Sequence, residues 1–210
     1  RPDSVVDGVS VHEARLTAGR VLARSHPVEA DVVIGAPDSG LDAALGYSYE
    51  SGIPYGIGLI KNKYIGRTFI QPTQKERTDS VRIKLNAVSA TVKDKRVVLV
   101  DDSIVRGTTS ARVIRILREA GAKEVHMRVS SPPFLWPCYF GTDVPARNQL
   151  IAYHRTISEI CDLIGTDSLD YLRIERLEEI AGNPGICKGC FTGKYPLDPP
   201  KDDIRGEFEQ

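Results

Sequence analysis

The fold is decided by one stretch of this 210-residue chain, Val97-Val-Leu-Val-Asp-Asp-Ser-Ile-Val-Arg-Gly-Thr-Thr-Ser110. Its apolar start predicts a buried β-strand, and its end predicts the first turn of an α-helix. Two acids and a hydroxyl-rich turn lie between the two elements. In an open parallel sheet, ligands bind outside the carboxyl ends of the strands, where these polar residues lie. The stretch therefore predicts a parallel α/β sheet and the position of its binding site.

The segments on both sides continue the alternation of buried strands and helices. Strands are expected at Asp31–Gly35, Pro54–Ile60, Arg96–Val100 and Glu124–Val129. Helices are expected at Val11–Arg24, Ser39–Glu50, with Ser39 as the N-cap, and Thr109–Ala120. This order favours a doubly wound parallel sheet that is covered by helices on both faces.

After Ser131 the pattern becomes irregular. Short helices are expected at Asn148–Ile151, Ser158–Ile164 and Arg176–Ala181, as a small C-terminal helical cap, and residues 196–210 are expected to be frayed.

Composition excludes several classes of protein. Lys plus Arg equals Asp plus Glu, at 28 each, so the sequence lacks the basic excess of a nucleic-acid binder. It contains no run of about 18 apolar residues that could span a membrane. We see no secretion signal, and because the chain opens without Met we expect it to begin inside a longer polypeptide. The four cysteines are therefore expected to be free thiols or metal ligands of a cytoplasmic protein.

The acid pair and the turn after it suit two parts of a phosphorylated sugar. Asp101 and Asp102 can accept hydrogen bonds from vicinal ribose hydroxyls and help to hold a hydrated Mg²⁺. The turn Ser103–Thr109 offers backbone N–H groups and hydroxyls at a helix N-terminus, which favours an anion. The simpler alternative is a capped helix preceded by two solvated acids, but the complete block favours a site. It is not a Walker loop, because no Gly-Lys-Ser/Thr is present.

Two further segments suit an anionic ligand. Gly35-Ala-Pro-Asp-Ser-Gly40 follows a predicted strand, although alone it would also fit an ordinary turn into a helix. Lys61-Asn-Lys-Tyr-Ile-Gly-Arg-Thr-Phe-Ile-Gln-Pro72 is basic and aperiodic, and continues to Arg82-Ile-Lys-Leu-Asn86. A basic loop of this kind can close over a multiply charged substrate and exclude water, although most charge clusters are merely solvated.

The stretch 97–110 resembles the phosphoribosyl-pyrophosphate (PRPP) signature of type I phosphoribosyltransferases. Lys61–Pro72 resembles the flexible loop of glutamine PRPP amidotransferases, and the similarity runs from Arg1 to Pro196. It implies a type I phosphoribosyltransferase fold with a flexible loop. The domain would span residues 1–180, with a core at about 10–132 and a cysteine-bearing tail at 181–210. Nothing in this chain resembles the glutaminase half of that family.

The resemblance also implies a role for each matching residue. PRPP would be bound by Asp38, Ser39, Gly40, Asp101, Asp102, Ser103, Ile104, Val105, Arg106, Gly107, Thr108 and Thr109, and Mg²⁺ by Ser39, Asp101 and Asp102. The catalytic loop residues would be Lys61, Tyr64, Arg67 and Lys84.

The implied reaction transfers the phosphoribosyl group to ammonia from a glutaminase domain. It gives phosphoribosylamine and pyrophosphate, as the first committed step of purine biosynthesis. Purine nucleotides are the implied inhibitors, and the family implies a homo-oligomer. Two alternatives are a PRPP-sensing domain, which would require a DNA-binding module, and a salvage phosphoribosyltransferase, which would require an aromatic base-binding hood.

The cysteines form a separate signal. Cys187-Lys-Gly-Cys190 alone fits a metal site, a redox pair or coincidence. A thioredoxin-like role is disfavoured, because the pair does not follow the first strand of a βαβ unit. The resemblance implies a 4Fe-4S cluster held by Cys138, Cys187 and Cys190, with its fourth ligand outside this chain. Cys161 matches none of these ligands and is expected to be a small buried residue.

Overall fold

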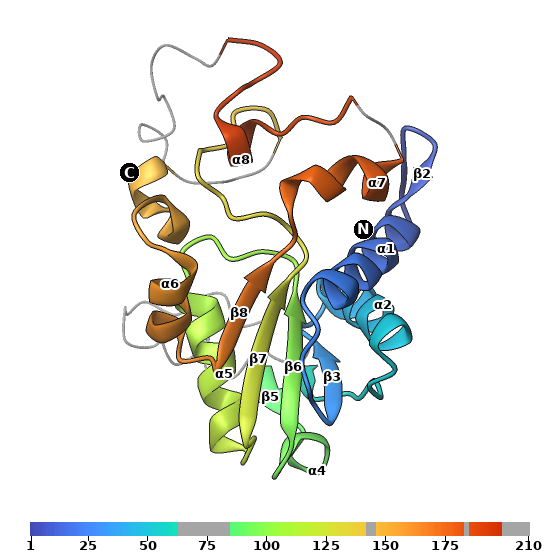
Figure 1. The fold of residues 1–210 in the computed structure, drawn as a ribbon, viewed down its shortest axis with the longest axis vertical. Coiled ribbons are helices and arrows are strands. Elements are labelled where there is room, and N and C mark those ends of the chain that lie inside the picture. Colours follow the sequence, from blue (N-terminus) through green and yellow to red (C-terminus); the bar gives the residue numbers. More distant parts are fainter. Residues whose placement is uncertain (63–84, 142–145, 183–184, 199–210) are drawn as a thin grey trace.

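A four-stranded parallel sheet forms the centre of the computed structural model, which describes residues 1–62, 85–141, 146–182 and 185–198. The strand order is β3-β6-β7-β8, with β3 at Val32–Gly35, β6 at Arg96–Asp101, β7 at Glu124–Val129 and β8 at Ser168–Tyr171. All four strands point toward the end of the molecule where the C-terminal segment lies (Figure 1). The predicted parallel α/β sheet is confirmed.

Alternate residues of the strands pack against helices on opposite faces of the sheet. Val33, Val98 and Val100 belong to one buried cluster with side chains of α1 (Val11–Ser25) and α2 (Leu41–Ser51). Ile34 and Leu99 belong to a second cluster with α5 (Thr108–Glu119) and α6 (Ile157–Ile164). Because neighbouring strand residues point to opposite faces, this alternation produces the predicted doubly wound arrangement.

The first two helices approach each other closely. A Cβ atom added at Gly19 would overlap the carbonyl oxygen of Ala43, and one added at Gly46 would overlap that of Leu16. The two glycines therefore let α1 and α2 pack backbone to backbone over β3 and β6.

Strand β8 was not predicted, and it lies beyond the predicted core of residues 10–132. Its sequence, Ser168-Leu-Asp-Tyr171, is half polar and so resembles a loop. The polar side chains are used internally: the buried Arg128 guanidinium contacts Asp170 Oδ2 at 3.1 Å and donates to Ser168 Oγ at 3.0 Å. Arg128 Nε also donates to the carbonyl oxygen of His26 at 3.1 Å, so one buried arginine joins β7, β8 and the end of α1.

The predicted strand Pro54–Ile60 is wrong over most of its length. Tyr55 forms only an isolated parallel bridge with Val33, after which the chain leaves the sheet. Strand β4, Leu59–Lys61, pairs antiparallel with β5, Leu85–Ala87, which the sequence did not predict. In the sequence, β4 precedes and β5 follows residues 63–84, which are outside the described residues.

The remaining elements are short. They are β1 (Val5–Val6), β2 (Val9–Ser10), α4 (Ser89–Val92), η2 (Arg147–Gln149), η3 (Ile151–Tyr153), η4 (Ile174–Arg176), α7 (Leu177–Ala181) and α8 (Gly189–Thr192). The predicted short helices thus correspond to 3₁₀ turns and to helices α6 and α7.

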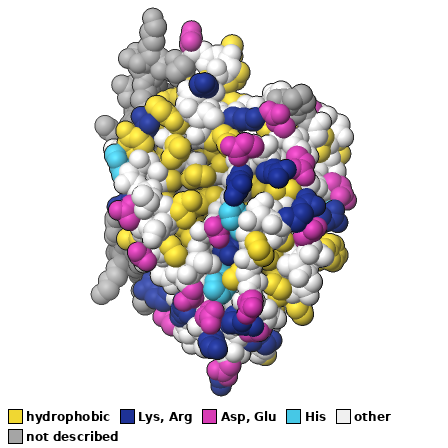
Figure 2. Space-filling view, in the orientation of Figure 1, with side chains coloured by type: hydrophobic (Ala, Val, Ile, Leu, Met, Phe, Trp, Pro, Cys, Tyr) yellow, Lys and Arg dark blue, Asp and Glu magenta, His cyan; other side chains and the backbone are white. Residues whose placement is uncertain are grey.

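Acidic and basic side chains are interspersed on the face shown in Figure 2, beside a group of hydrophobic side chains. No helix in the described part of the chain is long and apolar enough to cross a membrane.

Candidate active site

Strand β6 leads into the acid pair and the turn that the sequence singled out. Asp101 is the last residue of the strand and is partly buried, whereas Asp102 is exposed. Helix α5 begins at Thr108 after Gly107, and no side chain caps its N-terminus. The first N–H groups of a helix have no acceptor within the helix, so this end can bind an anion.

Gly107 is required by the shape of this turn. Its φ of +80° lies in the left-handed region, and an added Cβ would overlap Cδ1 of Ile151. Ile151 is buried beneath the turn and donates its backbone N–H to the carbonyl oxygen of Val105 at 2.9 Å. The sequence analysis did not identify Ile151, because a single apolar residue in an irregular segment carries no visible signal.

The turn after β3 lies directly beside the end of β6. The Ala36 N–H donates to the carbonyl oxygen of Val100 at 2.9 Å. Ser39 does not cap α2 as predicted: Gly40 is the N-cap residue, and Ser39 Oγ donates to Asp102 Oδ1 at 2.9 Å. The hydroxyl is therefore held by the acid pair rather than by its own helix, and it joins two turns that are 63 residues apart in sequence.

Lys61 lies beside the same turn, at the end of β4. Its Nζ contacts Asp38 Oδ2 at 2.9 Å, with both side chains about half exposed. An exposed pair of this kind contributes at most about 1 kcal/mol, so Lys61 can exchange this partner for a ligand at little cost. Tyr64, Arg67 and Lys84 lie outside the described residues.

A cavity of about 320 Å³ opens between these segments, lined by residues that include Pro37, Lys61, Leu85, Thr109 and Arg112. Arg112 was not among the site residues predicted from the sequence. Its position one turn after Thr108 was the available signal, since residues four apart lie on the same side of a helix.

The acid pair has unusual electrostatics. Burial raises the pKa of Asp101 to about 8, and the hydrogen bond and charge of Asp102 act in the same direction. The Asp102 N–H donates to Asp101 Oδ1 at 2.8 Å and opposes this effect without cancelling it. Asp101 therefore retains its proton at neutral pH in the ligand-free protein. Asp102 accepts the hydroxyl hydrogen bonds of Ser39 at 2.9 Å and Ser103 at 3.3 Å.

The three cysteines implied as cluster ligands lie near one another. Burial raises the pKa of the Cys190 thiol to about 11, and the neighbouring Cys138 and Cys187 act in the same direction. Within the part of the chain that the structure describes, however, no three His, Cys, Asp or Glu side chains are arranged to hold a metal ion. Three thiols are also one fewer than a four-iron cluster requires. The described residues therefore do not form a complete cluster site.

The fold and the site define a class of protein. A parallel sheet whose carboxyl edge carries an acid pair beside an open helix N-terminus is the type I phosphoribosyltransferase arrangement. Residues 12–131 match the phosphoribosyl transferase domain family, and this chain belongs to that family.

Particular relatives are similar over nearly the whole chain. The chain is 56% identical to the amidophosphoribosyltransferase of Archaeoglobus fulgidus, over 97% of this chain and 45% of the relative. It is 53% identical to that of Methanocaldococcus jannaschii, over 98% of this chain and 44% of the relative. The solved glutamine PRPP amidotransferase of B. subtilis, complexed with ADP and GMP, shares 53% identity and a TM-score of 0.88, over 96% of this chain and 46% of that one. This chain thus spans less than half the length of these relatives.

The raised pKa of Asp101 predicts a pH dependence of stability in the ligand-free protein. The folded state holds this proton more tightly than the unfolded state does, so the stabilisation present below the ordinary pKa near 4 is lost as the pH rises through about 8. Within that window, one proton contributes about 1.4 kcal/mol per pH unit. Replacing Asp101→Asn should remove this slope from urea unfolding curves recorded between pH 5 and 8 in EDTA.

The exposed Asp94→Asn is the matched control and should keep the slope of the wild type. Equal slopes for Asp101→Asn and the wild type would show that Asp101 is not protonated in the folded protein.

Proposed function

We propose that this chain binds the magnesium complex of PRPP and transfers its phosphoribosyl group to ammonia. The observation that carries the proposal is the hydrogen bond from Ser39 to Asp102, since it joins the turn after β3 to the acid pair. The amidophosphoribosyltransferase relatives support the reaction, because they match this chain almost from end to end.

Each part of PRPP has a place in this proposal. The 5′-phosphate would bind at Ser103–Thr109, where α5 begins, and the ribose hydroxyls would bind at Asp101 and Asp102. The pyrophosphate would bind at Asp38–Gly40, next to Lys61. Closure of the Lys61–Arg82 loop over the ligand remains part of the proposal, with Tyr64, Arg67 and Lys84 as further catalytic residues.

The donors present fit the magnesium ion of the substrate complex. Mg²⁺ prefers oxygen ligands and is commonly held by one or two carboxylates together with substrate phosphates. Asp101, Asp102 and the Ser39 hydroxyl offer such oxygen atoms at one edge of the sheet. The pyrophosphate oxygens would complete the coordination.

The proposed reaction requires no covalent intermediate with the protein. The bond between C1 and the pyrophosphate oxygen breaks, a bond between C1 and nitrogen forms, and ammonia loses one proton. Lys61 and the backbone N–H groups of the turns neutralise the leaving group, while the fixed phosphate and ribose contacts hold C1 in place. Water must be kept away, because the cationic character of C1 in the transition state would otherwise lead to hydrolysis.

The surroundings of this chain are also part of the proposal. Ammonia would come from a glutaminase domain, and purine nucleotides would bind in the phosphate and ribose site. That purine nucleotides bind is supported by the B. subtilis relative, which was solved as a complex with ADP and GMP. The protein would be a cytoplasmic homo-oligomer, as the resemblance to the amidotransferase family implies. Residues 1–180 would form the phosphoribosyltransferase domain and 181–210 the cysteine-bearing tail. With a fourth thiolate from outside the chain, Cys138, Cys187 and Cys190 would hold a structural 4Fe-4S cluster.

The transferase activity is tested by pyrophosphate release from PRPP in the full-length protein, with Mg²⁺ and with ammonium chloride in place of glutamine. Replacing both acids, Asp101→Asn and Asp102→Asn, should lower the rate by at least about 100-fold, because the ribose and the metal lose their charged ligands. The Asp94→Asn variant should retain the wild-type rate.

Two results would separate the parts of this proposal. Tight magnesium-dependent binding of PRPP without ammonia-dependent release of pyrophosphate would support the proposed binding site and contradict the proposed reaction. A double variant that releases pyrophosphate as fast as the wild type would show that the acid pair is not the site.

The cluster is tested by anaerobic reconstitution of the full-length protein with iron and sulfide. Wild-type protein and the Cys161→Ser control should both show the broad visible absorption of an iron–sulfur cluster and bind about four iron atoms per chain. Cys190→Ser should lose most of this iron, because one thiolate ligand is missing. Equal iron contents in the two variants would count against the proposed ligands.

A further inference from the structure

The turn Ser103–Gly107 is supported from below by the 3₁₀ segment Arg147–Tyr153, which comprises η2 and η3. Ile151 contacts the turn in two ways. Its N–H donates to the carbonyl oxygen of Val105 at 2.9 Å, and its side chain fills the space beside Gly107 where a Cβ would lie. Because Ile151 is buried, it cannot move without displacing the turn. The shape of the turn thus depends on where this 3₁₀ segment lies.

The 3₁₀ segment is itself held in place by a stack of planar groups. The Arg147 guanidinium lies 3.2 Å from the centre of the Trp136 ring and 3.9 Å from that of Tyr153. Its Nε also donates to the carbonyl oxygen of Leu135 at 3.2 Å. An arginine enclosed in this way is fixed in position by its flat shape as well as by its charge.

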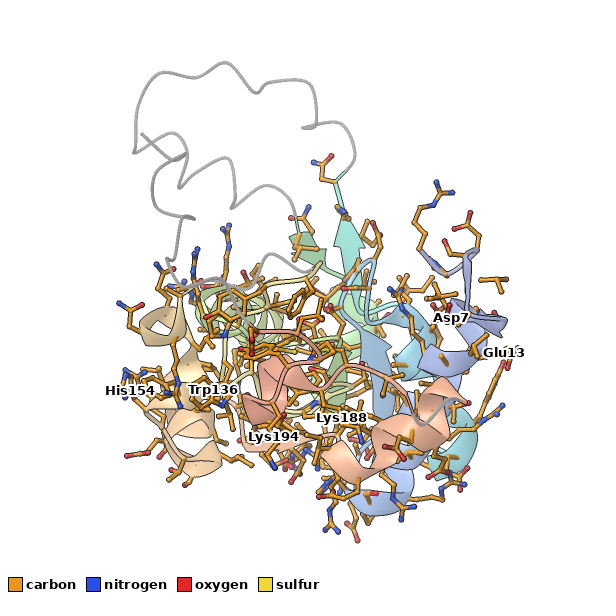
Figure 3. The ribbon with its side chains drawn as sticks, turned by 90° about the horizontal axis from the view of Figure 1, so that it is seen from above. Asp7, Glu13, Trp136, His154, Lys188 and Lys194 are labelled. Atoms are coloured by element: carbon orange, nitrogen blue, oxygen red, sulfur yellow. The ribbon has the colours of Figure 1, made fainter. Side chains whose placement is uncertain are left out.

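The other side of the stack is the cysteine-bearing tail. The N–H groups of Leu135 and Trp136 both donate to the carbonyl oxygen of Cys190 at 3.0 Å. The Trp136 ring lies against Gly193, which leaves no space for a side chain there. In Figure 3, Trp136 is labelled between His154, which follows η3, and Lys188 and Lys194, on either side of α8. A continuous series of contacts therefore runs from the tail, through Trp136 and Arg147, to Ile151 and the turn.

We propose that Arg147 and Ile151 are positioning residues for the phosphate-binding turn, and that Trp136 couples this turn to the docked cysteine-bearing tail. The assignment of the turn to the 5′-phosphate of PRPP rests on the proposed function. The mechanical support of the turn rests only on the contacts between these residues. Undocking of the tail would release Trp136, loosen Arg147 and weaken binding at the phosphate end of the ligand. It would leave the pyrophosphate end, at Asp38 and Lys61, unchanged.

The first test measures the turn without any ligand. Amide hydrogen exchange of the full-length protein should be at least about tenfold faster at Val105–Gly107 in Arg147→Ala than in the wild type, with no change in strand β6. Arg147→Lys keeps the positive charge but loses the planar group that stacks on the Trp136 and Tyr153 rings, so its exchange rate should be intermediate. Trp136→Leu should produce the same faster exchange as Arg147→Ala, because it breaks the contact between the tail and Arg147. Arg155→Ala, an exposed arginine nearby, is the matched control and should exchange like the wild type.

The second test measures which end of the ligand is affected. In Arg147→Ala, calorimetry should show about tenfold weaker binding of ribose 5-phosphate and unchanged binding of magnesium pyrophosphate. The KM for PRPP should rise by a similar factor at nearly constant kcat. A general loss of structure would weaken both ligands together.

Unchanged exchange at Val105–Gly107 in both Arg147→Ala and Trp136→Leu would overturn the proposal, as would equal weakening of both ligands. A wild-type protein that binds neither PRPP nor ribose 5-phosphate would instead overturn the proposed function, and the exchange data would still decide the positioning role.

Discussion

The parallel pairing of β3 with β6 is the constraint on which the rest of the site depends. Gly35, the last residue of β3, is paired with Val100, so the two strands end within one residue of each other. The Ala36 N–H then donates to the Val100 carbonyl oxygen, and the two turns that follow lie against each other. Segments that are more than 60 residues apart in sequence are thus brought within hydrogen-bonding distance, as the Ser39 to Asp102 contact shows.

The same geometry gives the acid pair its chemistry. A carboxyl group at the buried end of a strand loses solvation, and a second carboxyl beside it disfavours a further negative charge. The pKa of Asp101 is therefore raised to about 8. At neutral pH the acid pair thus carries less negative charge than its composition suggests.

Most of the sheet and much of the site could be predicted from the sequence. The strand, acids, turn and helix of residues 97–110 are contiguous, so local pattern was enough. The residue pattern alone does not predict the hydrogen bond from Ser39 to Asp102, because a serine before a helix is normally its cap. Only the family resemblance grouped Ser39 with Asp101 and Asp102. Strand β8 was missed because its polar residues satisfy a buried arginine, which gives it the composition of a loop. Ile151 was missed because its importance comes from filling the space beside Gly107, a contact between segments that are distant in sequence.

The central claim is that the turns after β3 and β6 form one site for the two ends of PRPP. The most direct measurement is a crystal structure of the full-length protein with Mg²⁺ and PRPP, in the absence of ammonia and glutamine. The account predicts the 5′-phosphate at Ser103–Thr109, the ribose hydroxyls on Asp101 and Asp102, and the pyrophosphate at Asp38–Gly40. Density for PRPP at any other place, with these turns free of ligand, would contradict it.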